Sequence, residues 1–338
     1  MNSVGRNLRL WRIGILSGTG TARKRTIPAL LGSEMCRVTV VHGRNDDQLK
    51  LAVGSAPEIH MASSEREFAE LRHHYDVIYI GSPPFLHLPH IQLAVQLGMP
   101  VICEKPLVTQ RQQLGPLLKL IGDSNIPFMV AHHIRHQPAV TDIMDIINAG
   151  RLGSPIAASL QWCFQMDHSA PNARWKLDPL SGGSSAMFDC GVHAVDLAVC
   201  LFGAPDRIGA VGHHVRSADV LDSVVALLDY SGFSVTVVAS QSGSSAENDL
   251  RITFPTSVLR AVGLLGEKAV RTIEIVGESG AKKLTYGPIN LYKAEVENFC
   301  RSLGTSIAAG TTVADAALTT RILFAVEDAL RTGSLIDL

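Results

Sequence analysis

The chain has 338 residues, enough for two domains, and its composition of 46% apolar and 18% charged residues is that of a globular protein rather than a disordered one. Thirty Lys and Arg residues face 31 Asp and Glu residues, so the charge balance gives no reason to expect nucleic acid or an anionic membrane as a partner. The first apolar run, 13–16, is too short for a secretory signal, and no apolar stretch is long enough to span a bilayer.

The cysteines predict a reducing compartment, and we therefore expect a cytoplasmic protein. They are scattered, form no C-x-x-C pair and mostly lie in apolar runs, as expected of buried free thiols. No Cys/His cluster has the spacing of a zinc site, so we expect no metal. The six are Cys36, Cys103, Cys163, Cys190, Cys200 and Cys300.

The first part of the chain alternates between strand-like and helical segments. Strands are expected at 11–16, 37–41, 59–62, 76–81, 99–103 and 127–131. Helices are expected at 22–31, with Pro28 as a possible kink, and at 50–53, 87–97 and 112–121. This alternation predicts right-handed β-α-β units and a doubly wound parallel sheet.

After about residue 150 the strands follow one another without helices between them, which predicts an α+β domain with an open, mostly antiparallel sheet. We place the domains at 1–131 and 132–338, with the last helix as a candidate to pack back on the first domain. Strands are expected at 156–164, 207–213, 223–230, 233–240, 250–253, 269–276 and 282–286, and helices at 186–201, 289–302 and 312–331.

A turn of small residues follows the first expected strand and could hold a dinucleotide, because backbone N–H groups at a helix start bind pyrophosphate. The segment Ser17-Gly18-Thr19-Gly20-Thr21-Ala22 does not match the usual G-x-G-x-x-G/A fingerprint. Counting from Gly18 puts the third small position on Arg23, whereas counting back from Ala22 puts Ser17 and Thr19 at the glycine positions. An ordinary βα turn remains the alternative.

The second expected strand ends at His42-Gly43-Arg44, where an NAD site usually carries an acid for the ribose hydroxyls. Arg44 instead offers a cation for a 2′-phosphate, which favours NADP. An exposed loop arginine without function is the alternative, and the nearby Asp46 and Asp47 keep NAD possible.

Two further polar groups follow strands of the expected parallel sheet. Ser82-Pro83-Pro84 comes after the fourth strand and Glu104-Lys105-Pro106 after the fifth, at the edge where open α/β sheets place their ligands. An exposed Glu-Lys pair before a helix is also common in proteins without a site, so these residues alone do not decide the question.

An apolar helix further on carries a polar stripe. Asp189, His193 and Asp196 have the spacing i, i+4, i+7, which puts them on one face. A buried His paired with Asp189 is the structural interpretation. A His oriented by a carboxylate is also what proton transfer at neutral pH requires.

Taken together, these residues resemble the Gfo/Idh/MocA family, named for glucose–fructose oxidoreductase and inositol dehydrogenase. The similarity runs from about residue 11 to the final helix. It rests on Glu104-Lys105-Pro106 after Gly98-x-Pro100, Ser82-Pro83-Pro84-x-x-His87, Trp175-Lys176-x-Asp178-Pro179-x-Ser181-Gly182-Gly183, and Asp189-x-Gly191-x-His193-x-x-Asp196.

The resemblance implies a Rossmann-type domain that binds NAD or NADP and a second domain that forms a substrate wall and often an oligomer interface. It implies catalytic roles for Lys105, Asp189 and His193, and a substrate contact for Arg135 as well. The cofactor is expected to contact Ser17 to Ala22, Arg44, Ser82, Pro83, Pro84, His87, Glu104, Lys105, Trp175 and Lys176.

The function implied is hydride transfer between nicotinamide and a carbinol or ketone carbon of a sugar, sugar nucleotide or cyclitol. The segment from Ala22 to Ala29 resembles that of family ketoreductases acting on deoxysugar nucleotides, which favours a sugar or sugar-nucleotide substrate. We expect a homodimer or homotetramer. Two alternatives stay open: a sensing protein of the same fold without turnover, and a lyase or glycosidase that uses tightly bound NAD for transient oxidation.

Overall fold

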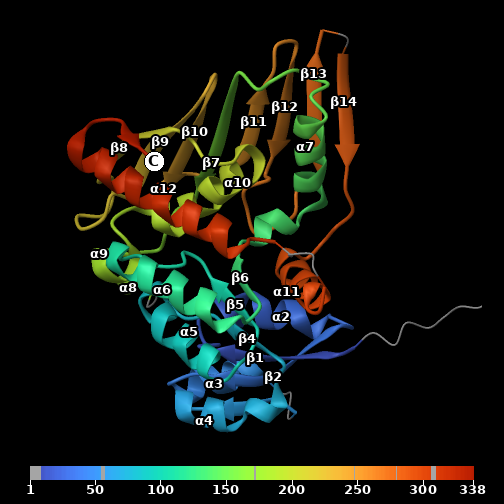
Figure 1. Ribbon diagram of the computed structural model, residues 1–338, viewed down its shortest axis with the longest axis vertical. Coiled ribbons are helices and arrows are strands. Elements are labelled where there is room, and N and C mark those ends of the chain that lie inside the picture. Colours follow the sequence, from blue (N-terminus) through green and yellow to red (C-terminus); the bar gives the residue numbers. More distant parts are fainter. Residues whose placement is uncertain (1–8, 55–57, 171–172, 247, 279, 306–309) are drawn as a thin grey trace, which may run out of the picture.

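The computed structural model describes residues 9–54, 58–170, 173–246, 248–278, 280–305 and 310–338. Its two sheets lie one above the other in Figure 1, with the first, N-terminal sheet below and the second above. This arrangement confirms the predicted fold class, a doubly wound parallel sheet followed by an α+β unit.

The first sheet has the strand order β3-β2-β1-β4-β5-β6, and all of its pairings are parallel. Because the order reverses beside β1, the crevice at the carboxyl ends of β1 and β4 is where such sheets bind ligands. The strands are β1 (Trp11–Leu16), β2 (Cys36–His42), β3 (His60–Ala62), β4 (Val77–Ile80), β5 (Val101–Glu104) and β6 (Phe128–Ala131).

Helices cover both faces of this sheet, because its strands carry apolar side chains on both faces. Ile13 and Ile15 of β1 pack in one cluster with α2, α3 and α11, whereas Leu16 belongs to the cluster of α4, α5 and α6. The helices are α1 (Thr21–Lys24), α2 (Thr26–Leu31), α3 (Asp46–Val53), α4 (Glu65–Glu70), α5 (His87–Gln96) and α6 (Arg111–Ser124), with short 3₁₀ turns η1 (Arg72–His74) and η2 (Pro84–Leu86).

The predicted helix 22–31 is instead two short helices. The break is at Arg25, whose φ of −126° and ψ of −69° are not helical, and not at Pro28. Pro28 is the third residue of α2, where its missing N–H is one of the donors that no helical carbonyl would accept, so the proline causes no kink.

The second sheet has the order β14-β13-β12-β11-β7-β10-β9-β8-β15, and β7 with β10 is its parallel pair among the described strands. Strand β12 was not predicted, because its sequence alternates only weakly and it is recognised as a strand by pairing with β11 and β13. The strands are β7 (Ala157–Cys163), β8 (Arg207–His213), β9 (Ser223–Tyr230), β10 (Phe233–Ser240), β11 (Asp249–Thr253), β12 (Ser257–Val262), β13 (Thr272–Gly277), β14 (Gly280–Thr285) and β15 (Ile336–Asp337).

The later helices join the two sheets. Helices α10 and α12 contact the second sheet and each other, whereas α11 returns to α2 and β2 of the first sheet, beside which it lies in Figure 1. The helical elements are η3 (His133–His136), α7 (Pro138–Asn148), α8 (Ala173–Lys176), α9 (Pro179–Gly182), the π turn η4 (Met187–Gly191), α10 (Val192–Phe202), α11 (Leu291–Ser302) and α12 (Val313–Thr332).

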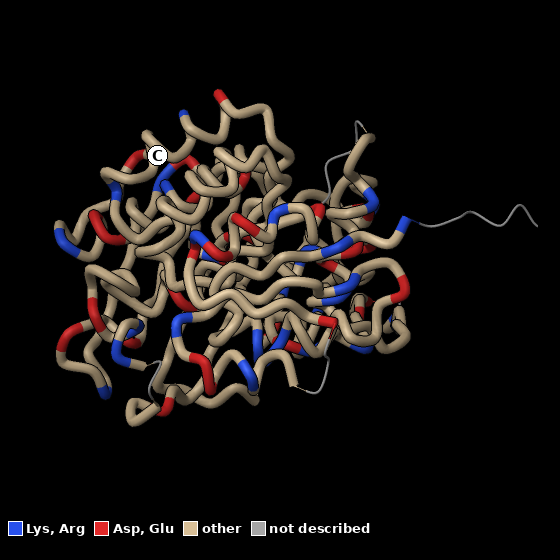
Figure 2. Tube along the Cα trace, turned by 90° about the horizontal axis from the view of Figure 1, so that it is seen from below, with Lys and Arg blue, Asp and Glu red and all other residues tan. Residues whose placement is uncertain are grey.

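The distribution of charged residues and the state of the cysteines agree with what the sequence predicts. Lys/Arg and Asp/Glu positions are interspersed along the trace in Figure 2. All six cysteines are free and five are buried, with Cys200 half-buried, which confirms the predicted free thiols. Within the described ranges, no helix combines the length and apolar character needed to cross a membrane.

Candidate active site at the carboxyl edge of the first sheet

The turn after β1 is held tightly against the end of β2. Ser17 has a φ of +64°, a left-handed conformation that favours glycine, and its N–H donates to His42 Nδ1 at 3.2 Å. The N–H of Gly18 donates to the carbonyl of His42 at 2.8 Å, and a Cβ on Gly18 would lie 2.4 Å from Val41 Cγ1. Ser17 therefore takes the tight-turn conformation that the first glycine of a dinucleotide fingerprint provides.

Ala22 takes the role of the third small residue. Ala22 is fully buried, and a Cβ added to Gly81, which follows β4, would lie only 3.1 Å from the Ala22 Cβ. By contrast, a Cβ on Gly20 would meet no protein atom within 4 Å, so a glycine there leaves the backbone open to a ligand. The structure thus selects the register counted back from Ala22, with Ser17 and Thr19 at the glycine positions.

The end of β2 closes the other side of this turn. A Cβ on Gly43 would lie 2.5 Å from Thr19 Cγ2, so only glycine fits between the two loops. Arg44 is exposed, and among the described residues it has no hydrogen-bond or ion-pair partner. Its guanidinium is therefore available to an anionic ligand, as the sequence suggested.

The turn after β4 is supported from behind by two histidines. His90 Nδ1 lies 2.9 Å from Ser82 Oγ, and the two ring nitrogens of His87 lie 3.0 Å from the Ser82 carbonyl and 3.1 Å from the Leu107 carbonyl. His87 is fully buried, and this burial lowers its pKa. The expected contact between His87 and a cofactor is therefore corrected to support of the Ser82 turn.

Glu104 similarly supports Lys105. Its Oε1 accepts a hydrogen bond from the Tyr79 hydroxyl at 2.7 Å, and its Oε2 accepts from the Lys105 backbone N–H at 3.3 Å. Burial raises the pKa of Glu104. The carboxyl group thus fixes the end of β5, from which the Lys105 side chain extends.

Asp189 lies at the centre of a cluster of cations. The Lys176 ammonium donates to both of its carboxylate oxygens at 2.8 Å, and Gln241 Nε2 donates to Oδ2 at 2.9 Å. Lys105 Nζ donates to the Asp189 carbonyl and lies 3.6 Å from Oδ1. Burial would raise the pKa of Asp189, but Lys176 and Lys105 hold it well below its usual range. Asp189 is therefore a carboxylate at neutral pH.

Trp175 and Lys176 lie on the short helix α8. The ammonium of Lys176 lies on Asp189, 5.7 Å from the Trp175 ring centroid, and the cofactor contact predicted for Lys176 stays a prediction. Sequence reasoning missed this ion pair because the two residues come from separate elements. The motif that contains Trp175 and Lys176 was the available signal, since it immediately precedes the helix that carries Asp189.

His193 is oriented by aromatic rings rather than by Asp189. Its ring stacks on Trp162 with centroids 4.5 Å apart and meets the edge of His133 at 4.9 Å. Its Nδ1 is buried without a hydrogen-bond partner in the part of the chain that the structure describes. Burial, followed by Lys105, lowers the pKa of His193 well below 6.5. The expectations that Asp189 orients it and that it titrates near neutrality are both corrected.

The predicted polar stripe of Asp189, His193 and Asp196 does not form one continuous face, because Asp189 lies in a π turn and the other two lie in the α-helix that follows. Asp189 lies in η4, whereas Asp196 lies in α10, and the wider i→i+5 hydrogen bonding of a π turn rotates one relative to the other. The carboxylate of Asp196 accepts hydrogen bonds from Arg135 Nε at 2.7 Å and from Nη2 at 2.8 Å. The carboxylate of Asp315 accepts one from Arg135 Nη1 at 2.9 Å. These bonds occupy the guanidinium, so we correct Arg135 from a substrate contact to a link between η3, α10 and α12.

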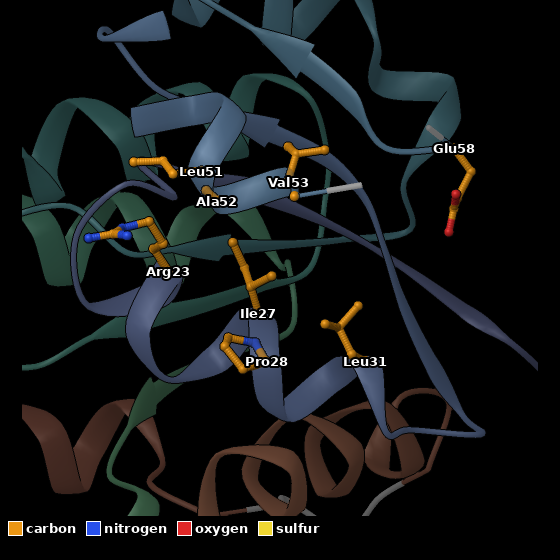
Figure 3. Close-up of a pocket in the computed structure, with 9 residues that line it drawn as sticks. Arg23, Ile27, Pro28, Leu31, Leu51, Ala52, Val53 and Glu58 are labelled. Atoms are coloured by element: carbon orange, nitrogen blue, oxygen red, sulfur yellow. The ribbon is translucent and has the colours of Figure 1, made fainter. Parts of the chain in front are cut away.

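Three surface cavities lie outside this cluster, and none has Lys105, Asp189 or His193 among its described lining residues. One of about 510 Å³ lies between α2 and α3, with Ile27 and Leu31 on one side and Leu51 on the other (Figure 3). A second of about 730 Å³ lies between α2 and the segment 267–271, and a third of about 670 Å³ lies between η3 and α11.

A parallel sheet with a small-residue turn at its switch point, facing a lysine–aspartate–histidine cluster, defines a nicotinamide-dependent oxidoreductase. The comparisons with known proteins then give the family. Residues 12–132 match the oxidoreductase family with an NAD-binding Rossmann fold, and residues 140–281 match the GFO/IDH/MocA C-terminal domain. The chain belongs to the GFO/IDH/MocA family.

Relatives of known activity support this membership. The chain is 24% identical to D-xylose 1-dehydrogenase (NADP(+)) 2 of Haloferax volcanii, over 96% of this chain and 99% of the relative. It is 32% identical to a dTDP-3,4-didehydro-2,6-dideoxy-alpha-D-glucose 3-reductase of Streptomyces violaceoruber, over 68% and 66%. Its fold matches an aldose-aldose oxidoreductase from Caulobacter crescentus with a TM-score of 0.87 at 18% identity, over 98% and 100%.

Proposed function

We propose that this protein transfers hydride between NADP and a carbinol or ketone carbon of a sugar, sugar nucleotide or cyclitol. The observation that carries the proposal is the convergence of Lys105, Asp189 and His193 at the carboxyl edge of a NAD-binding sheet. The relatives support the substrate class, because the Haloferax protein is a xylose dehydrogenase and the Streptomyces protein reduces a nucleotide-linked keto sugar.

The described residues fit a dinucleotide. The open space at Gly20 allows close backbone approach at the start of α1, where pyrophosphate is held in such folds. Unpaired Arg44 would bind a 2′-phosphate, which supports NADP over NAD. Ser82 to Pro84 and Lys105 would hold the nicotinamide end, and Trp175 remains a proposed contact there. When bound, the nicotinamide supplies or accepts the hydride.

Lys105 is the residue that we assign to proton transfer. Its ammonium faces the ionised Asp189, and it could donate a proton to the oxygen that becomes an alcohol during ketone reduction. His193 is neutral, so its role is to hydrogen-bond and orient the substrate oxygen from its fixed position on Trp162. Asp189 holds Lys105 and Lys176 in place.

The test is turnover by Lys105→Met and His193→Phe, with Lys119→Met on the exposed face of α6 as the matched control. We expect Lys105→Met to lose roughly 10²–10⁴-fold in kcat, the usual effect of removing a positioned acid. His193→Phe should lose activity while the affinity for NADP stays within a few-fold. Parent-like kcat in a folded Lys105→Met variant would exclude the assigned role.

We also propose that the protein is cytoplasmic and assembles as a homodimer or homotetramer. The six free thiols support a reducing compartment. Exposed apolar residues on the outer face of the second sheet support assembly through that face, among them Val211, Val225 and Leu227.

A further inference from the structure

We propose that the cavity between α2 and the segment 267–271 binds a phosphate group of the substrate, so that the preferred substrate is a nucleotide-linked or phosphorylated sugar. This inference rests on the proposed function and narrows its substrate class. The cavity has a volume of about 730 Å³, within the range of small-ligand pockets. Both halves of the molecule contribute to it, with α1 and α2 on one side and the loop after β12 and the residues before α11 on the other.

The charge of the lining selects an anion. Four cationic side chains and one carboxylate line the cavity, which leaves three positive charges in excess in a chain whose net charge is −1. The carboxylate of Glu267 pairs with Arg25. Among the described residues, the side chains of Lys24, Lys268 and Arg271 have no hydrogen-bond or ion-pair partner. Unpaired Lys and Arg side chains that converge on one cavity suit phosphate oxygens.

The cavity adjoins the candidate active site through two aromatic rings. Tyr292 lines the cavity and stacks on His133 with centroids 4.8 Å apart, and His133 meets His193 at 4.9 Å. His133 Nε2 also lies 3.2 Å from the carbonyl of Gly266, next to the cationic segment. The rings of His133 and Tyr292 therefore lie between His193 and the cavity, and the proposal places the sugar at His193 and its charged substituent beyond Tyr292.

The cofactor's own phosphates are the other source of the same chemistry, and the placement of the cavity argues against them. The turn from Ser17 to Gly20 precedes α1, whereas Lys24 is the last residue of that helix and Arg25 follows it. Arg44 lies at the end of β2 and does not line the cavity. The two phosphate sites are thus formed by separate residues.

The experiment compares the parent with the double variant Lys268→Gln/Arg271→Gln. The matched control is Arg260→Gln/Lys282→Gln, which removes two exposed cations of the same sheet that do not line the cavity. Calorimetric titration with inorganic pyrophosphate should show at least tenfold weaker binding to the double variant, and parent-like binding to the control. Equal pyrophosphate affinity in all three proteins would overturn the proposal.

Two further measurements distinguish substrate phosphate from cofactor phosphate, and distinguish failure of the anion site from failure of the proposed oxidoreductase function. Against free sugars, sugar phosphates and nucleoside diphosphate sugars, the double variant should lose kcat/KM for the phosphate-bearing substrates alone, with an unchanged Kd for NADP. A weakened Kd for NADP would assign the cavity to the cofactor instead. Turnover of free sugars only would overturn the phosphate site and leave the oxidoreductase intact. Absence of all hydride transfer would contradict the proposed function. The calorimetric titration with pyrophosphate would then still test the anion site by itself.

Discussion

Asp189 and His193 are four residues apart, yet each is controlled by different neighbours. Lys176 and Gln241 bind the carboxylate, whereas Trp162 and His133 fix the imidazole. Their spacing alone suggested a mutual hydrogen bond. The ion pairs with Lys176 of α8 and with Lys105, which follows β5, are charge-assisted and therefore stronger than a neutral bond to histidine, which explains why the carboxylate turns towards the lysines.

We propose that Arg44 decides the choice between NADP and NAD. We expect Arg44→Ala to weaken NADP binding by about tenfold or more, because a charge-assisted contact to phosphate is lost, and to leave NAD binding within two-fold. Calorimetric titration of both cofactors measures this. Arg37→Ala, an exposed arginine earlier on β2, is the control. If NAD bound more tightly than NADP to the parent, a 2′-phosphate contact at Arg44 would be ruled out.

At the scale of elements, short irregularities position the site. The break at Arg25 between α1 and α2 lets this side chain pair with Glu267 across the two halves of the molecule. The π turn η4 places the Asp189 side chain on Lys176 and Lys105 while α10 continues with His193 and Asp196. Both irregularities depend on contacts from distant segments, so a local pattern does not reveal them.

The second sheet has one buried face and one exposed face, and the exposed face carries apolar side chains on β8 and β9. In β8 and β9, Val211 pairs with Val225, and their side chains are 62% and 38% exposed, whereas Ile208 and Leu228 point inwards and are fully buried. A row of exposed apolar side chains on a sheet is typical of an interface. We therefore expect a second copy of the chain to cover this face.

Light scattering tests this assembly. The parent should have at least twice the 36.3 kDa mass of one chain at micromolar concentration, and Val225→Asp/Leu227→Asp should shift it to a single chain. Leu31→Asp, which changes an exposed leucine on α2 away from this face, should leave the mass unchanged. A parent that is monomeric at these concentrations would contradict the expectation.

At the scale of the whole molecule, buried histidines make the fold sensitive to acid. Burial lowers the pKa of His90 and His136 to about 4 and that of His133 to about 3, against 6.5 for an exposed histidine. Because the folded pKa is the lower one, the unfolded chain binds more protons below pH 6.5. The stability contributed by each neutral histidine is full above pH 6.5 and is lost as the pH falls towards the folded value.

We therefore expect the free energy of unfolding to fall between pH 6.5 and 4, by about 1.4 kcal/mol per pH unit for each such histidine. Urea unfolding at several pH values measures this slope. His133→Phe keeps a ring against Tyr292 and should reduce the slope by one histidine's share, whereas His213→Phe at an exposed position should not. A slope that is equal in both variants would show that His133 is not the neutral buried group described here.

The sequence by itself determined the parallel first sheet, the mostly antiparallel second sheet, the family and the positions of Lys105, Asp189 and His193, because apolar periodicity and strand-end motifs are local properties. The tertiary structure alone decided the partners of these residues. It paired Lys176 with Asp189, committed Arg135 to Asp196 and placed His193 on Trp162. Burial, pKa shifts and the cation-lined cavity arise where distant segments meet, and that proximity is a property of the packed chain, which no local pattern encodes.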